Sequence, residues 1–173
     1  MRSLILGGAR SGKSALAERI AMASSLEVVH IATAQAGDAE MRERIAHHRS
    51  RRPPHWRSVE EPIALASSLG DCAGEARCVL VDCLTLWLTN LLAHADASRF
   101  ERERDALLDV LPALPGQIVL VSNEIGLGIV PMGALTRRFV DEAGRLHQAL
   151  AHRCDRVLFV AAGLPLALKG TYE

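Results

Sequence analysis

The 173 residues are 49% hydrophobic and 23% charged, a composition typical of soluble globular proteins that excludes a disordered chain and a coiled coil. Lys and Arg number 20, as do Asp and Glu, and aromatic residues make up only 3% of the chain. The surface therefore lacks the net positive charge and the stacking platforms that nucleic-acid binding needs, so we expect no nucleic-acid partner. The length fits a single domain over residues 1–173.

The cysteines and the apolar segments bear on where the protein works. The four cysteines form no C-x-x-C pair, and the N-terminus carries no pattern of a secretory signal, which favours reduced thiols in a cytoplasmic protein. The most apolar stretch, residues 157–168, contains Gly163 and Pro165 and is too short to cross a bilayer. We therefore predict a cytoplasmic protein with no transmembrane segment.

Short apolar runs alternate with longer helical patterns along the chain. The apolar runs predict main strands at 4–6, 28–31, 79–81, 118–121 and 157–160, with a short extra strand at 56–60. The helical patterns between them predict helices at 13–24, 39–49, 84–93, 100–111 and 134–152. Each main strand is apolar on both of its faces, as parallel strands covered by helices on both sides are. The predicted fold class is α/β, with a mainly parallel sheet and helices on both faces.

The turn between the first strand and the first helix matches G-x-x-x-x-G-K-[ST] in full. Backbone N–H groups of such a loop point at the β-phosphate of a nucleotide, and the helix that follows adds its dipole. Lys13 can reach the β- and γ-phosphates, and the Ser14 hydroxyl can ligate Mg²⁺. The sequence predicts a P-loop NTPase whose nucleotide-binding loop is Gly7, Gly8, Ala9, Arg10, Ser11, Gly12, Lys13 and Ser14.

A P-loop needs a second metal partner, and Asp82 follows the apolar run 79–81 in the way such a residue does. Asp82 could instead cap the helix that starts near Leu84, and the two roles are compatible. Thr85 fits the start of that helix better than a metal site. The chain lacks both the guanine-reading motif of GTPase switches and the signature of transport ATPases, so the class that remains is a small-molecule kinase.

The segment 41–56 holds three of the seven histidines together with several arginines. Arginines can clamp phosphates, and a histidine can act as a base or take up a phosphoryl or nucleotidyl group. Helical spacing turns His48 toward an apolar stripe and His47 toward a polar one. A solvated basic helix end explains the same residues, and periodicity does not decide which histidine would react.

Five motifs in order along the chain resemble the family of bifunctional adenosylcobinamide kinases/adenosylcobinamide-phosphate guanylyltransferases. They are Gly-Gly-Ala-Arg-Ser-Gly-Lys-Ser at 7–14, Ile-Ala-Thr at 31–33, Arg-Ile-Ala-His-His-Arg at 44–49, Pro-His-Trp-Arg at 54–57 and Asn-Glu-Ile-Gly-Leu-Gly-Ile-Val-Pro at 123–131. The resemblance implies a RecA-like arrangement, a homotrimer and two reactions on adenosylcobinamide. A nucleoside triphosphate, ATP or GTP, phosphorylates the aminopropanol hydroxyl, and GTP then donates GMP to adenosylcobinamide phosphate.

The resemblance also implies roles for single residues. His47 is the histidine that carries GMP, and Lys13 acts in catalysis. The Mg²⁺ ligands Ser14 and Asp82 are expected from the P-loop pattern described above. Beyond the loop 7–14, the implied nucleotide contacts are Thr33, Ala34, Gln35, His48, Arg49, Ser50, Arg51, Glu60 and Asp82. Ala34 and Ala36 are less polar than the family pattern, which leaves Thr33 and Gln35 to make the contacts of that loop.

Residues outside these motifs remain open. Glu124, after the strand 118–121, could orient the substrate hydroxyl, bind metal or simply cap the strand, and the loop from Gly126 to Pro131 could form part of the corrinoid site. His147 and His152 fit a surface or an interface, and Cys83 fits packing. Two other interpretations compete: an ordinary ATP-dependent metabolite kinase in which His47 is structural, and a non-catalytic nucleotide-binding regulator.

Overall fold

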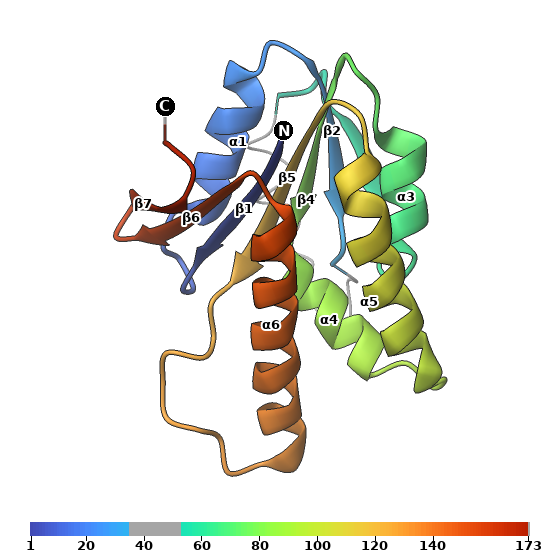
Figure 1. Cartoon of the computed structure of the whole chain (residues 1–173), viewed down its shortest axis with the longest axis vertical. Coiled ribbons are helices and arrows are strands. Elements are labelled where there is room, and N and C mark those ends of the chain that lie inside the picture. Colours follow the sequence, from blue (N-terminus) through green and yellow to red (C-terminus); the bar gives the residue numbers. More distant parts are fainter. Residues whose placement is uncertain (35–52, 173) are drawn as a thin grey trace.

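A computed structural model describes residues 1–34 and 53–172. In this part of the chain a seven-stranded sheet has the order β3-β2-β4-β5-β1-β6-β7 (Figure 1). The strands β1 to β6 are parallel, and β7 runs antiparallel to β6. The mainly parallel sheet predicted from the sequence is confirmed. The strands are β1 Arg2–Gly7, β2 Glu27–Ala32, β3 Arg57–Glu60, β4 Arg77–Asp82, β5 Gln117–Asn123, β6 Arg156–Ala161 and β7 Leu164–Lys169.

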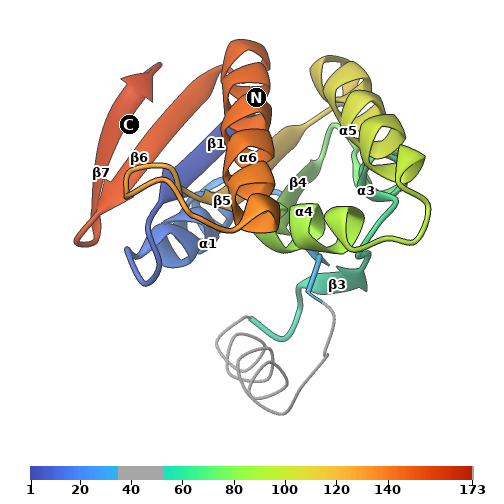
Figure 2. The ribbon, with the colours of Figure 1, turned by 90° about the horizontal axis from the view of Figure 1, so that it is seen from below.

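Helices cover both faces of the sheet, but unequally. The helix α1 packs on one face, while α3, α4, α5 and α6 lie on the other (Figures 1 and 2). The predicted helices at 13–24, 84–93, 100–111 and 134–152 are confirmed, and the one at 39–49 lies outside the described residues. The helices are α1 Lys13–Ala23, α3 Leu65–Cys72, α4 Leu84–Leu92, α5 Ser98–Val110 and α6 Ala134–Arg153, with a 3₁₀ turn at Leu111–Ala113.

Two elements were not predicted from the sequence. In α3, Leu65, Leu69 and Cys72 are buried at helical spacing, but Gly70 and two serines, which are poor helix formers, weaken the local pattern. The strand β7 pairs with β6 after a tight turn at Ala162 and Gly163, both with positive φ. Its leucines alternate with other residues but remain exposed, so no buried face marks it as a strand.

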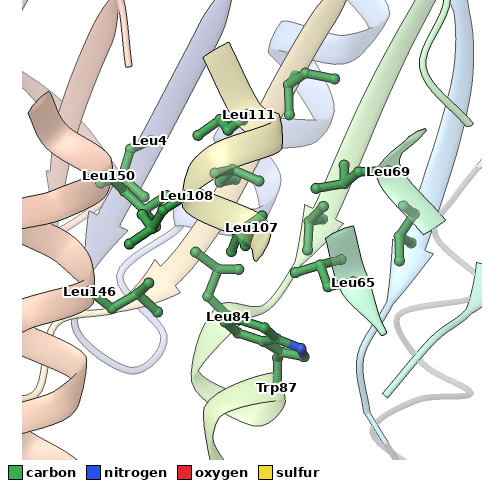
Figure 3. Packing of buried hydrophobic residues seen from close by; sticks show 14 of the residues in the cluster. Leu4, Leu65, Leu69, Leu84, Trp87, Leu107, Leu108, Leu111, Leu146 and Leu150 are labelled. Carbon is green, nitrogen blue, oxygen red and sulfur yellow. The ribbon is translucent and has the colours of Figure 1, made fainter. Parts of the chain in front are cut away.

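The larger hydrophobic core lies between the sheet and the helices α3 to α6 (Figure 3). Trp87 of α4 is fully buried there, and its indole Nε1 donates a hydrogen bond to the Ile63 carbonyl at 2.8 Å. Leu84 and Leu107 are also fully buried in this core. The smaller core joins α1 to the opposite face through Leu16 and Ile5. Helices therefore pack on both faces of the strands whose ends carry the connecting loops.

The described part of the chain contains no helix that is both long enough and apolar enough to span a membrane.

Candidate functional site

The carboxyl ends of the parallel strands meet at one edge of the sheet, the edge at which open α/β proteins bind ligands. Gly7 at the end of β1 pairs with Asn123 of β5, and Asp82 at the end of β4 pairs with Val121 of the same strand. On the other side of β4, Asp82 pairs with Ala32 at the end of β2, and Ala32 pairs in turn with Glu60 at the end of β3. The fold therefore brings the loop 7–14, Asp82 and Glu60 to one edge from three distant parts of the sequence.

The backbone of the loop 7–14 leaves no room for a side chain at its first glycine. A Cβ atom on Gly7 would lie 2.5 Å from the Val160 carbonyl oxygen and 2.6 Å from Ser11 Oγ. Gly12 has a φ of 97°, and a Cβ there would lie 3.1 Å from the Cα of Gly163. The Ser11 carbonyl accepts a hydrogen bond from Gly163 N at 2.8 Å, so the β6–β7 turn supports the loop.

A Gly7→Ala substitution is therefore expected to shift the loop. We expect a loss of about 1–3 kcal/mol in the free energy of unfolding, as for other overpacked sites, together with weaker nucleotide binding. Urea unfolding and nucleotide titration of the same samples measure both effects. Gly144→Ala within α6 is the matched control, since a Cβ there meets nothing within 4 Å. Equal stability of Gly7→Ala and the wild type would contradict the close packing described here.

The start of α1 is arranged to receive an anion. Among the described residues no side chain caps α1, so the N–H groups of its first turn are left for another acceptor. The Ser11 Oγ is buried and has no hydrogen-bond partner in the described part of the chain. A phosphate oxygen at this position would satisfy both kinds of donor. This local chemistry fits the nucleotide-binding loop predicted from the sequence.

Lys13 is buried beside this loop, with only 8% of its surface exposed, and its Nζ donates a hydrogen bond to the Gly8 carbonyl at 3.0 Å. Burial lowers the pKa of the Lys13 ammonium, while the nearby Asp82 carboxylate raises that pKa. Lys13 and Asp82 thus lie close enough to interact, as the cation and the metal ligand of one triphosphate site must.

Asp82 does not cap α4. The N-cap position of that helix is Cys83, and no side chain of the described residues makes a capping hydrogen bond to it. The capping alternative for Asp82 is therefore wrong, which leaves the carboxylate available for another role. Thr85 lies in the first turn of α4, as expected, and its Oγ1 accepts hydrogen bonds from Asn123 N at 3.1 Å and Asn123 Nδ2 at 3.0 Å. Cys83 is buried, as predicted for a packing residue.

Thr33 is fully buried, and its hydroxyl is already engaged. The Thr33 Oγ1 donates to the Cys83 carbonyl at 2.7 Å and accepts from Cys83 N at 3.1 Å. In addition, Asn90 Nδ2 donates to the Thr33 carbonyl at 2.8 Å. These bonds tie the end of β2 to the residue after Asp82, an arrangement that favours a positioning role for Thr33 over a direct contact of its hydroxyl with a nucleotide.

His147 differs from the sequence expectation of a surface or interface residue. Only 6% of its surface is exposed, and its Nε2 lies 2.8 Å from Ser122 Oγ. The expectation was wrong because His147 falls on the same face of α6 as the buried Ala143, Leu146 and Leu150, a spacing visible in the sequence. His152, in the last turn of that helix, is exposed as expected.

The comparison with protein families decides between the possible P-loop classes. A family model described as cobinamide kinase / cobinamide phosphate guanyltransferase matches residues 3–168. The chain belongs to this family. Its membership confirms the bifunctional kinase and guanylyltransferase class that the sequence motifs predicted, and it excludes the regulator without catalytic activity as the main interpretation.

Members of the cobinamide kinase/guanyltransferase family match nearly all of the chain. A bifunctional adenosylcobalamin biosynthesis protein CobP of Pseudomonas aeruginosa is 66% identical over 170 residues, covering 98% of this chain and 98% of the relative. The CobU protein of Escherichia coli, described in the same words, is 38% identical over 182 residues, covering 98% of this chain and 100% of the relative. The likeness therefore extends over nearly all of this chain and of both relatives.

Solved structures support the fold of this family member. The RadB recombinase has a TM-score of 0.51 at 18% identity, covering 91% of this chain and 73% of RadB. A protein of Pyrococcus horikoshii has a TM-score of 0.55 at 10% identity, covering 99% of this chain and 87% of that one. At such identities the likeness concerns the fold alone, and it agrees with the RecA-like P-loop arrangement expected from the sequence.

The predicted residues Gln35, His47, His48, Arg49, Ser50 and Arg51 lie outside the described residues. Ala34, the last described residue before them, follows β2 at the carboxyl edge, and Glu60 is exposed at the end of β3 on the same edge. The described part of the site thus consists of the loop 7–14, which includes Lys13, and of Asp82. Glu60 lies farther along the same edge.

Proposed function

We propose that this cobinamide kinase/guanyltransferase transfers a phosphoryl group from ATP or GTP to the aminopropanol hydroxyl of adenosylcobinamide. It then transfers GMP from GTP to adenosylcobinamide phosphate, giving adenosylcobinamide-GDP and pyrophosphate. The observation that carries this proposal is the family match over residues 3–168, together with a complete P-loop at the edge where α/β sheets bind ligands.

Lys13, Ser14 and Asp82 serve the triphosphate in this proposal. Lys13 neutralises charge on the β- and γ-phosphates, while Ser14 and Asp82 hold Mg²⁺. Magnesium commonly takes one or two carboxylates and completes its shell with phosphate oxygens and water. A hydroxyl and a single carboxylate are therefore a fitting donor set, even though the described residues hold no cluster of three or more His, Cys, Asp or Glu suited to a metal.

His47 is the nucleophile of the second reaction. Its neutral imidazole attacks the α-phosphorus of GTP, pyrophosphate leaves, and the phosphate of adenosylcobinamide phosphate then displaces the histidine. The nucleotide contacts proposed outside the loop 7–14 are Ala34, Gln35, His48, Arg49, Ser50, Arg51 and Glu60, while Thr33, whose hydroxyl is bonded to Cys83, positions the end of β2. Support comes from the family resemblance of the motif 44–49 and from Ala34, which lies at the carboxyl edge just before this segment.

The corrinoid requires a surface wider than the P-loop, and the loop between β5 and α6 offers one. Leu127, Ile129, Val130 and Met132 are exposed by 73% or more of their surface. An exposed apolar patch of this kind marks a binding surface in many proteins. We assign this loop to the corrinoid ring.

We expect a cytoplasmic homotrimer from the family resemblance. Light scattering measures the oligomeric state.

Incubation of the protein with adenosylcobinamide and GTP, followed by mass spectrometry, tests the proposed function. We expect adenosylcobinamide phosphate first and adenosylcobinamide-GDP later. Formation of the phosphate alone, with no covalent GMP on the protein, would favour the simple kinase. A protein that binds GTP and forms neither product would instead be a non-catalytic binder.

Asp82→Asn is expected to raise the Mg²⁺ concentration that gives half-maximal kinase activity by at least about tenfold, the lower range for losses in metal sites. The substitution keeps the side-chain volume, so the melting temperature should change little. A magnesium titration at saturating substrates measures the effect. Asp71→Asn is the control, since Asp71 is exposed near the end of α3. An unchanged titration for Asp82→Asn would remove Asp82 from the metal site.

A further inference from the structure

Glu124 leaves the sheet between the two parts of the triphosphate site. The strand order β4-β5-β1 puts the end of β5 between Asp82, at the end of β4, and Gly7, at the end of β1. Glu124 follows β5 directly, and its backbone N–H donates to the Gly7 carbonyl at 3.0 Å. A carboxylate at this position emerges beside the phosphate-binding loop on one side and the proposed metal ligand on the other.

The carboxylate of Glu124 is held by two neighbours. Its Oε1 accepts a hydrogen bond from the Gly126 backbone N–H, and its Oε2 lies 3.7 Å from His147 Nδ1. The Glu124 side chain keeps 21% of its surface exposed, whereas that of His147 keeps 8%. Glu124 can therefore meet a substrate, while His147 supports it from inside the protein.

Ser122 fixes the orientation of that imidazole. Ser122 Oγ lies 2.8 Å from Nε2, and in the tautomer whose ring proton is on Nδ1 the Ser122 hydroxyl donates to Nε2 while Nδ1–H points toward the acceptor oxygens of Glu124. The order Ser–His–Glu resembles a hydrolase triad, but Ser122 has only 1% of its surface exposed, so its hydroxyl cannot reach a substrate. The accessible end of this network is the carboxylate.

The other acidic residues at this edge either lie farther from the phosphate-binding loop or already have another interaction. Asp82 raises the pKa of Lys13 electrostatically and is the proposed metal ligand. Glu61 Oε1 accepts the N–H groups of Ile63 and Ala64 at 2.8 and 2.7 Å before α3 begins. Glu60 is at the end of β3, and the strands β2, β4 and β5 lie between β3 and the loop-bearing β1. Among the described residues, Glu124 is thus the accessible carboxylate next to the phosphate-binding loop that has no other assigned role.

We propose that Glu124 is the proton acceptor of the kinase step and that His147 is a positioning residue that holds it. The inference rests on the proposed function and deepens it. As the hydroxyl oxygen of adenosylcobinamide bonds to the γ-phosphorus, its proton passes to a Glu124 carboxylate oxygen. The bond from the γ-phosphorus to the β,γ-bridging oxygen breaks, and the nucleoside diphosphate leaves with that electron pair. Glu124 then releases its proton to water.

The two reactions of this enzyme separate the role of Glu124 from a general effect on nucleotide binding. Attack of a neutral imidazole on GTP, and attack of a substrate phosphate on the adduct, remove no proton from an alcohol. Glu124→Gln should therefore lower kcat of the kinase step by about 10²–10⁴-fold, the usual contribution of a general base. Labelling of the protein by GTP and GMP transfer to supplied adenosylcobinamide phosphate should stay within threefold of wild type. Glu75→Gln, exposed before β4 at the opposite edge, is the matched control.

His147 is tested by two substitutions that differ in whether the side chain carries an N–H donor. Asn can place an N–H donor where Nδ1 lies, while Leu cannot. His147→Leu should lower kcat of the kinase step with little change in KM for adenosylcobinamide, and His147→Asn should restore most of it. Equal losses in both variants, or a rise in KM alone, would show that His147 only packs.

Glu124→Ala provides a second route if the glutamine variant is poorly folded, because added formate can replace a missing carboxylate. We expect formate to raise its kinase rate several-fold, with no effect on Glu75→Gln. Kinase activity of Glu124→Gln within threefold of wild type, or parallel loss of both reactions in a protein with normal melting temperature, would overturn the proposal. Wild-type protein that forms neither product would instead refute the proposed function itself.

Discussion

Replacing His47 with Ala is expected to abolish the covalent attachment of GMP to the protein. A neutral imidazole is nucleophilic near pH 7 without a separate base, so attack on the α-phosphorus of GTP gives a phosphoramidate. Such a bond is labile in acid and stable in base. Incubation with GTP labelled at the α-phosphate, followed by acid or alkali treatment of the denatured protein, should show a label that only acid removes. The His47→Ala variant should carry none.

The neighbouring histidine provides the control for this result. His48→Ala should keep at least part of the label, and His152→Ala, which changes an exposed residue of α6, should keep all of it. The kinase step should survive in His47→Ala, because that reaction proceeds at the γ-phosphorus without the histidine. A label that persists in His47→Ala but disappears in His48→Ala would assign the adduct to the second histidine. Absence of label from every form, wild type included, would leave the simple kinase as the function.

Lys13→Ala is expected to lower the rates of both reactions by at least about 100-fold. Removal of one preorganised electrostatic group has an effect of this size. Phosphoryl and guanylyl transfer both need the triphosphate charge neutralised, and Lys13 is the buried cation beside the loop that binds it. Measured rates of kinase turnover and of histidine labelling should fall together.

Lys169 is the other lysine of the chain and the matched control for Lys13→Ala. Its Nζ donates to the carbonyls of Ala151 and His152 at 2.9 and 3.2 Å, at the C-terminal end of α6 and on the exposed surface. Lys169→Ala removes the same charge and should leave both rates nearly unchanged. If Lys13→Ala retained full histidine labelling while losing kinase activity, GTP would be bound for guanylylation at a second nucleotide site.

Local sequence was sufficient for most of the fold and for the phosphate loop. The strands β1, β2, β4, β5 and β6 are short runs apolar on both faces, and this pattern follows directly from burial between two helical layers. The loop 7–14 is equally local, because its shape depends on glycines at set positions and on the helix that follows.

Elements that depend on distant partners were predicted less well. The strand β7 forms because its backbone pairs with β6. Its leucines are exposed, so their pattern does not predict that pairing. Thr33 looked like a nucleotide contact, yet its hydroxyl bonds to Cys83, fifty positions later in the chain. The local sequence around a side chain does not predict which distant backbone group it will contact in the folded protein.

The sequence by itself determined the family, the P-loop chemistry, the order of the strands along the chain and the candidacy of His47. Only the tertiary structure decided which side chains meet at the carboxyl edge of the sheet. Ser122 lies on β5, and Glu124 directly follows that strand. Both lie next to His147 of α6 because that helix packs across the sheet. An imidazole becomes a buried support for a carboxylate, and not a surface residue, only when this packing removes water from around it, and burial of that kind lowers the pKa of His147.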